Sequence, residues 1–194
     1  MKHLFIYGDS NVYGTRLYGL RVRFRNRWAN QLQQLLGDEW RVSNDGVPGR
    51  VAGDYRTGKP QKNGQRFYLD ALKKTDRPDL IIIALGTNDL QQRFHRTVPE
   101  IIADLQWYQQ ASDHTPMLYL LPTHFERIPE FTYESEEKLH ELLPECITKL
   151  GSCITLHDIP LSDGLHFSPA GHKKVAEPVA AAIQQFTKRS DSVN

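Results

Sequence analysis

The stretch DLIIIAL at residues 79–85, followed by GTND at residues 86–89, decides the fold of this chain. Its apolar residues are continuous rather than alternating, as in a parallel strand that is covered on both faces. The run from Leu80 to Leu85 is far shorter than the roughly 20 apolar residues that a membrane span needs. We therefore predict a buried central strand over residues 79–85, closed by a polar turn, and no membrane span.

Shorter apolar runs and amphipathic stretches alternate on both sides of this strand. The predicted strands are residues 4–7, 40–43, 79–85, 117–121 and 153–156. The predicted helices are residues 24–36, 66–74, 98–110, 133–150 and 169 to about 186, the last capped by Ser168 and kinked at Pro178. This alternation predicts a flavodoxin-like three-layer α/β/α sandwich with a five-stranded parallel sheet, formed by residues 1–194 as one domain.

The composition is typical of a globular protein. Of the 194 residues, 39% are hydrophobic and 24% are charged, which excludes a disordered chain. Cys146 and Cys153 are too few for a disulfide framework and lack the spacing of a metal site, and the residues before the first strand predict no signal peptide. We predict a cytoplasmic protein that uses no cofactor and no metal.

The charges are distributed unevenly along the chain. Residues 1–97 carry 17 basic and 9 acidic side chains, whereas residues 98–194 carry 7 and 14. The basic stretch is the segment that contains Arg16, Arg21, Arg23, Arg25 and Arg27. It is either a rim that attracts anionic esters or, as we favour, a solvated surface whose arginine stems pack on the protein. Nucleic-acid binding is not predicted, because the nearby Phe24 and Trp28 lie on the core face of the expected helix and Tyr18 alone is no stacking platform.

Polar clusters follow four of the predicted strands. They are Gly8-Asp9-Ser10, the segment from Asn44 to Gly49, the segment from Gly86 to Asp89, and the loop from Asp163 to His166. Because the carboxyl ends of parallel strands meet at one edge of the sheet, where ligands bind, we expect these four clusters to lie together.

Together the clusters contain the groups that acyl transfer needs. Ser10 is a nucleophile that needs a base, His166 can supply that base, and Asp163 can hold the imidazole in the required tautomer. The backbone N–H of Ser10, that of a glycine within residues 44–49 and the side-chain amide of Asn88 are candidate donors to an oxyanion.

Other polar side chains near these clusters receive different interpretations. Asp9 and Asp89 are expected to hold the turns that carry Ser10 and Asn88. His124 follows the fourth strand and is interpreted mainly as a hydrogen-bonded loop residue, with a pocket-lining role left open.

The four clusters, in this order, resemble the conserved blocks of the SGNH hydrolase superfamily, also called the GDSL esterase/lipase family. The matching segments are residues 6–14, 44–49, 86–89 and 163–166. The resemblance implies that Ser10 is the nucleophile, His166 the base and Asp163 its partner, with Ser10, Gly49 and Asn88 forming the oxyanion hole. It also implies a packing role for His172. Asn11 departs from the usual pattern and is expected to alter the pocket floor.

A narrower similarity, to the arylesterase branch, rests on Arg50, residues 63–64, 69–72 and 79–97. The implied function is hydrolysis of short-chain carboxylic esters through an acyl-enzyme on Ser10. An acyltransferase with an alcohol or peroxide acceptor, a carbohydrate O-deacetylase and a non-catalytic binding module are the alternatives. A nucleotide binder is not expected, because the first loop lacks a glycine-rich phosphate cradle. The expected partner is a small-molecule ester, and a homo-oligomer is left open.

Overall fold

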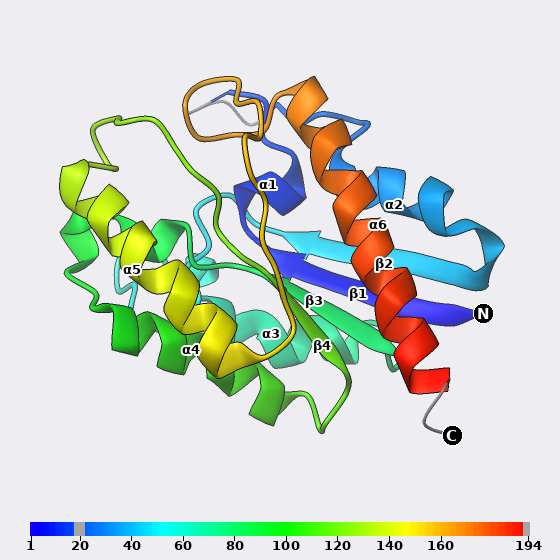
Figure 1. Cartoon of the computed structure of the whole chain (residues 1–194). Coiled ribbons are helices and arrows are strands. Elements are labelled where there is room, and N and C mark those ends of the chain that lie inside the picture. Colours follow the sequence, from blue (N-terminus) through cyan, green and yellow to red (C-terminus); the bar gives the residue numbers. More distant parts are fainter. Residues whose placement is uncertain (18–21, 192–194) are drawn as a thin grey trace.

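The computed structural model describes residues 1–17 and 22–191, so Tyr18 and Arg21 lie outside the described residues. A five-stranded, all-parallel sheet in the order β2-β1-β3-β4-β5 lies between two layers of helices (Figure 1). This confirms the predicted α/β/α class. In the described part of the chain, no helix is long and apolar enough to cross a bilayer.

Local sequence accounts for most of the element boundaries. The strands are β1 (Lys2–Gly8), β2 (Trp40–Gly46), β3 (Leu80–Ala84), β4 (Met117–Leu120) and β5 (Cys153–Ile154). The helices are α1 (Ser10–Tyr13), α2 (Trp28–Leu36), α3 (Gly64–Lys73), α4 (Val98–Ala111), α5 (Tyr133–Leu150) and α6 (Pro169–Asp191), with short 3-10 turns at Gly37–Glu39, Pro60–Lys62, Asn88–Leu90 and Gln92–Phe94. The predicted cap of α6 is confirmed, because Ser168 Oγ accepts the Gly171 N–H at 3.1 Å.

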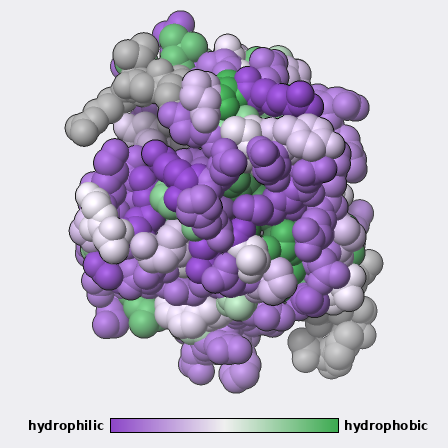
Figure 2. Space-filling model, turned by 90° about the vertical axis from the view of Figure 1, so that its left-hand side faces the viewer, coloured by the Kyte–Doolittle hydropathy of each residue, from purple (hydrophilic) through white to green (hydrophobic). Residues whose placement is uncertain are grey.

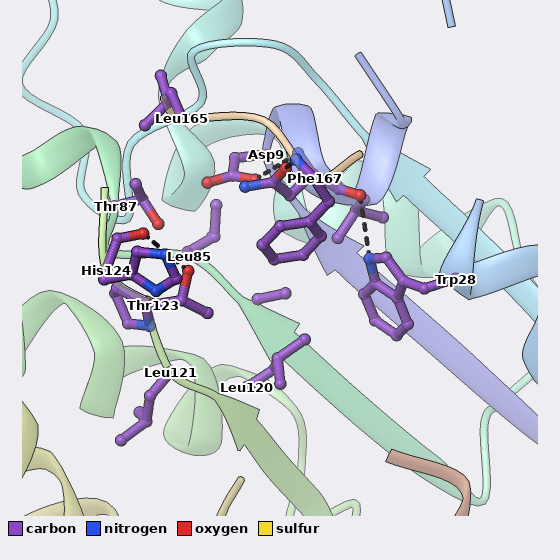
Figure 3. A pocket seen from close by; sticks show the side chains of 14 residues that line it. Asp9, Trp28, Leu85, Thr87, Leu120, Leu121, Thr123, His124, Leu165 and Phe167 are labelled. Atoms are coloured by element: carbon purple, nitrogen blue, oxygen red, sulfur yellow. Dashed lines mark hydrogen bonds between the residues drawn. The ribbon is translucent and has the colours of Figure 1, made fainter. Parts of the chain in front are cut away.

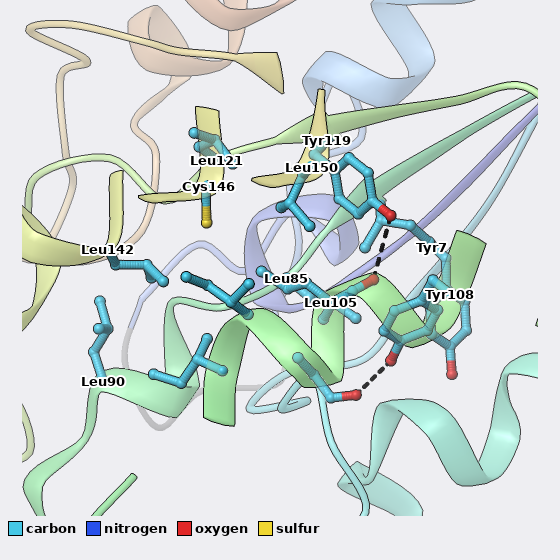
Figure 4. Close-up of a cluster of buried hydrophobic side chains, with 14 of the residues drawn as sticks. Tyr7, Leu85, Leu90, Leu105, Tyr108, Tyr119, Leu121, Leu142, Cys146 and Leu150 are labelled. Carbon is cyan, nitrogen blue, oxygen red and sulfur yellow. Dashed lines mark hydrogen bonds between the residues drawn. The ribbon is translucent and has the colours of Figure 1, made fainter. Parts of the chain in front are cut away.

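Successive residues of β1 point to opposite helical layers. Phe5 and Tyr7 pack with α3, α4 and α5, whereas Leu4 and Ile6 pack with α2 and α6. The first of these cores is rich in tyrosine, and Figure 4 shows Tyr7, Tyr108 and Tyr119 in it, with the hydroxyls of Tyr108 and Tyr119 in hydrogen bonds. The Tyr108 hydroxyl donates to the Ala52 carbonyl at 2.6 Å, which ties the loop after β2 to this core.

Three predicted boundaries differ from the structure by three residues or more. Helix α2 begins at Trp28 rather than at Phe24, because Phe24 N donates to Gly14 O at 2.8 Å beside an antiparallel bridge between Thr15 and Arg23. Strand β2 continues to Gly46, since its backbone pairs with β1 whatever the polarity of its side chains. Helix α6 continues through Pro178 to Asp191, beyond the expected end near Phe186.

The register of the sheet brings the strand-end clusters to one level. Gly8 of β1 is paired with Gly46 of β2 on one side and with Ala84 of β3 on the other. The turns that follow these three strands therefore start side by side. All strand arrowheads in Figure 1 point toward this edge.

Candidate active site

The turn between β1 and α1 holds Ser10 at the start of a short helix. Asp9 caps this helix by accepting the Asn11 N–H at 2.9 Å, and Ser10 is 5% exposed. Gly8 is required before the turn, because a Cβ there would collide with Val12 and with the carbonyl of Ala84. No acceptor within the described residues takes the Ser10 N–H, which leaves this donor available.

The loop after β5 brings Asp163 and His166 together. Asp163 Oδ2 lies 2.8 Å from His166 Nδ1, and Oδ1 accepts the His166 backbone N–H at 2.8 Å. A carboxylate can only accept, so Nδ1 carries the proton and Nε2 is the basic nitrogen. Burial opposes ionisation of Asp163, but the hydrogen bonds from His166 outweigh it and lower the pKa of the carboxyl. Asp163 therefore stays charged at neutral pH.

A hydrogen bond from a backbone N–H to a side chain links this loop to the Ser10 turn. The Phe167 N–H donates to Asn11 Oδ1 at 3.0 Å, joining the residue after His166 to the residue after Ser10. Sequence reasoning expected Asn11 at the pocket floor and missed this contact, which only the folded chain reveals. Asn11 does line the cavity at the site.

The turn after β2 positions the Gly49 N–H. Arg50 N donates to Val47 O at 3.0 Å, with Pro48 and Gly49 between them and Gly49 at φ +76°. Pro followed by a residue of positive φ is the pattern of a type II turn, which glycine adopts without strain. Within residues 1–17 and 22–191, no protein acceptor takes the Gly49 N–H.

Asn88 lies beyond the end of β3 with its amide orientation fixed. Gln91 Nε2 donates to Asn88 Oδ1 at 3.0 Å, which identifies the other amide atom as the donor Nδ2. Asn88 Nδ2 donates to the Arg50 carbonyl at 3.0 Å and lies 3.4 Å from Asp9 Oδ2. One amide hydrogen is thus committed to Arg50, and the other makes only a long contact.

Asp9 and Asp89 are buried beside these donors, as expected of turn-supporting residues. Both oxygens of Asp89 accept the Ala52 N–H at 3.0 Å, and Tyr55 donates to Oδ1 at 2.8 Å. Burial raises the pKa of Asp9 to about 7 and that of Asp89 to about 6. These two carboxyls are thus far harder to ionise than Asp163.

Arg50 organises the oxyanion side and was singled out in the sequence only by the narrower resemblance. It is 2% exposed, and its Nη1 donates to Gly8 O at 3.1 Å and to Asp45 O at 2.7 Å. Its guanidinium also lies 4.0 Å from the centre of the Tyr7 ring. One side chain therefore joins the ends of β1 and β2.

A small cavity of about 30 Å³ lies beside the Ser10 turn and the loop that carries His166 (Figure 3). Its walls include the neighbours of Ser10 and of His166, namely Asp9, Asn11, Leu165 and Phe167. His124 lies at its opposite wall, so the pocket-lining interpretation of this histidine is confirmed. A cavity of this size holds two or three water-sized groups.

His172 has the packing role that the resemblance implied. It is 0% exposed, its Nδ1 accepts the Trp28 N–H at 3.3 Å, and its ring packs edge-on against Phe24 and Phe167. Burial and the nearby Arg27 lower the pKa of His172 to about 4, so it is neutral at pH 7.

Arg16, Arg23 and Arg27 of the basic stretch pack on the protein rather than converging on the site, whereas Arg25 is exposed. Arg16 and Arg23 lie over the rings of Phe24 and Tyr13, and Arg27 donates to Asn44 Oδ1 at 2.9 Å. This agrees with the favoured interpretation of packed arginine stems.

A model of the GDSL-like lipase/acylhydrolase family matches residues 6–174, a span that includes every strand-end cluster. The chain belongs to this family. The SGNH resemblance is thereby confirmed. Figure 2 looks onto the edge of the sheet that carries these clusters, and hydrophilic residues dominate this face of the family member.

The acetylxylan esterase of Xylanibacter ruminicola is 27% identical to this family member over 201 residues. The match covers 86% of this chain, which spans 40% of the length of that relative. The M. smegmatis aryl esterase has a TM-score of 0.83 at 22% identity, covering 95% of this chain and 99% of that one. Est24, a carbohydrate acetylesterase from Sinorhizobium meliloti, has a TM-score of 0.81 at 21% identity, covering 96% and 100%. These two structural likenesses show the same fold.

Proposed function

We propose that this protein is a serine esterase that hydrolyses short-chain carboxylic esters through an acyl-enzyme on Ser10. The observation that carries the proposal is the meeting of the Ser10 turn with the Asp163–His166 pair at one sheet edge, in a chain of the acylhydrolase family. We further propose that residues 1–194 act as one catalytic domain in a reducing, cytoplasmic compartment. The free thiols of Cys146 and Cys153 support that location.

The proposed reaction begins with proton transfer from Ser10 to Nε2 of His166 as the serine oxygen attacks the ester carbonyl. Asp163 stabilises the imidazolium that forms. The negative oxygen of the tetrahedral intermediate is bound by the N–H groups of Ser10 and Gly49 and by the amide of Asn88. His166 then protonates the leaving alcohol, and water activated by the same histidine releases the acid.

The size of the cavity supports a short acyl group. About 30 Å³ matches the size of an acetyl or propionyl group. The relatives named for acetyl ester hydrolysis favour an acetylated carbohydrate as the substrate. Transfer to an alcohol or to peroxide is the same chemistry with another acceptor, and water is the acceptor that the proposal assigns.

The test is a series of 4-nitrophenyl esters from acetate to palmitate, measured with the wild type and with Ser10→Ala. We expect kcat/KM to be highest for acetate or propionate and to fall steeply beyond butyrate. Ser10→Ala should lose at least about 10⁴-fold in kcat. A phosphonate that reacts with activated serines should add one mass label to the wild type and none to the variant. Near-wild-type activity of Ser10→Ala would disprove the acyl-enzyme, and a preference for palmitate would disprove the short acyl group.

A further inference from the structure

An arginine that takes no part in the mechanism above, Arg56, contacts a residue of the proposed oxyanion hole. Arg56 is half-buried, and its Nη1 donates to the carbonyl oxygen of Gly49 at 2.5 Å. Its guanidinium therefore contacts the same residue whose backbone N–H is a proposed oxyanion donor. The ammonium of Lys62 also borders this turn, only 2.7 Å from where a Cβ of Gly49 would stand.

The ring of Phe94 contacts both Arg56 and a second arginine, Arg93. The guanidinium carbons of Arg56 and Arg93 lie 5.0 Å and 4.9 Å from the centre of the Phe94 ring. The ring itself packs edge-on against Tyr55, at 5.5 Å between ring centres. Tyr55 is in turn bound to buried Asp89, so the aromatic support is anchored in the oxyanion side of the site.

The neighbouring arginines differ from this pair in having carboxylate partners. Arg50 is paired with Asp45, Arg66 with Asp54, and Arg96 with Glu100 and Asp104. Across residues 1–17 and 22–191, no carboxylate lies within 4.0 Å of the cationic nitrogens of Arg56 or Arg93.

Two unpaired cations that share one ring repel each other. Burial and the charge of Arg93 lower the pKa of Arg56. Asp89 attracts Arg56, but its hydrogen bonds go to Ala52 and Tyr55. An anion that contacts both guanidiniums would offset the repulsion and gain charge-assisted hydrogen bonds.

We propose that Arg56 and Arg93, held on Phe94, bind a carboxylate of the ester substrate. The inference rests on the proposed function and extends it to a substrate class. Because the proposed acyl group is a small neutral one, the carboxylate belongs to the alcohol part of the ester, as in an O-acetylated acidic sugar. Guanidinium groups suit this task, since their planar array of N–H donors matches the two oxygens of a carboxylate.

The test compares two substrates that differ only in charge: an O-acetylated methyl glucuronoside and its neutral methyl ester. Acetate release is measured at low ionic strength as kcat/KM. We expect the wild type to prefer the carboxylate roughly tenfold and the preference to shrink at high salt. Equal rates, or a preference that salt leaves unchanged, would overturn the proposal.

Variants then assign the preference to these residues. Arg93→Gln should reduce the ratio of the two kcat/KM values to about two, and Arg93→Glu should bring it below one. Arg77→Gln is the matched control, because Arg77 is equally exposed but precedes β3 at the opposite end of the sheet. A ratio that falls to the same extent in the control, or that Arg93→Glu leaves unchanged, would contradict the assignment.

Failure of the inference is distinguishable from failure of the proposed function. Hydrolysis of both sugar acetates at equal rates overturns the carboxylate site alone. Full activity of Ser10→Ala overturns the proposed serine esterase function. If neither sugar acetate is cleaved, free methyl glucuronoside and its methyl ester are compared as inhibitors of 4-nitrophenyl acetate hydrolysis. Stronger inhibition by the carboxylate, weakened in Arg93→Gln, then supports the site, and equal inhibition rejects it.

Discussion

On one side of Ser10 the base and its carboxylate are carried by a loop, and on the other side the oxyanion donors are set in a buried polar network. The loop is held mainly through its backbone, as in the bonds from Ser162 N to His166 O at 2.8 Å and from Glu126 N to Gly164 O at 2.7 Å. The network is built from buried charges, with Arg50 at 2%, Asp9 at 3% and Asp89 at 0% exposure.

This difference separates chemistry from folding. In the loop, the carboxylate of Asp163 can be replaced by the isosteric side chain of asparagine, which keeps an acceptor for the Leu165 and His166 backbone N–H groups. A side chain of the network holds two or three partners, so its removal leaves buried groups without hydrogen bonds. Activity and stability should therefore respond in different proportions on the two sides.

The largest effect on activity is expected from Asp163→Asn. The asparagine can present its NH₂ group to Nδ1 of His166 and favour the wrong tautomer, so kcat should fall by about 10⁴-fold. The melting temperature should change by no more than a few degrees, because the asparagine keeps an Oδ1 that accepts the Leu165 and His166 backbone N–H groups. Steady-state kinetics and thermal unfolding of the same preparation measure both quantities. A large loss of stability would show that the base loop is not independent of folding.

Asn88→Ala should give a smaller kinetic effect and a larger structural one. Loss of one oxyanion donor lowers kcat by roughly 10²–10³-fold. The substitution also leaves the Arg50 carbonyl and the Gln91 amide unpaired, at a cost of roughly 1–3 kcal/mol in the free energy of unfolding. A kcat within about threefold of the wild type would remove Asn88 from the oxyanion hole.

The next prediction concerns the buried polar network only. It is a dependence of folding stability on pH that is caused by Asp9. Burial raises the pKa of Asp9 to about 7 from an ordinary value of 3.8. A carboxyl with a raised folded-state pKa destabilises the fold as pH rises through that interval, because the folded state must release a proton that it binds more tightly. Asp9→Asn keeps the oxygen that caps α1 and removes this ionisation.

We therefore compare the unfolding free energy of Asp9→Asn with that of the wild type at each pH. The difference, variant minus wild type, should increase by on the order of 2–3 kcal/mol from pH 5 to pH 8. The difference between the two proteins is the quantity to compare, because His172 has the opposite dependence. Its lowered pKa makes the fold less stable as pH falls from 6.5 toward 4. Urea denaturation at several pH values measures the gain, and a gain independent of pH would show that Asp9 ionises normally.

The smallest effect is expected where the two sides meet. Asn11→Leu removes the acceptor for Phe167 N. We expect kcat to fall roughly tenfold with KM little changed, because His166 is held less firmly over Ser10. Asn11→Asp keeps an acceptor oxygen and should retain most of the activity. Equal losses in both variants would contradict a positioning role.

The sequence sufficed for the layers of this fold and for the residues at each strand end. The continuous run of residues 80–85 identified a strand buried on both faces, and four polar clusters marked one edge of the sheet. Family membership is shown independently, whereas the roles of Ser10, Gly49, Asn88, Asp163 and His166 are still predictions that the kinetics above will test.

What the sequence did not reveal are contacts between distant segments. The bond between Asn11 and Phe167 joins residues that lie 156 positions apart, and no local pattern encodes it. The start of α2 was placed too early because the apolar Phe24 fits a helical period while its backbone pairs with Gly14. The pairing of Arg56 with Arg93 on Phe94 depends equally on two loops meeting in space.

The direction of the first strand and the last helix has a practical consequence. Strand β1 starts, and α6 ends, at the side of the sheet away from the strand arrowheads (Figure 1). A linker, an affinity tag or a solid support attached through either of these elements would leave the mouth of the site facing outward. If the protein is immobilised on a surface in this way, its site faces the solution. An ester carried by a polymer that is too large to diffuse around the protein should still reach the site.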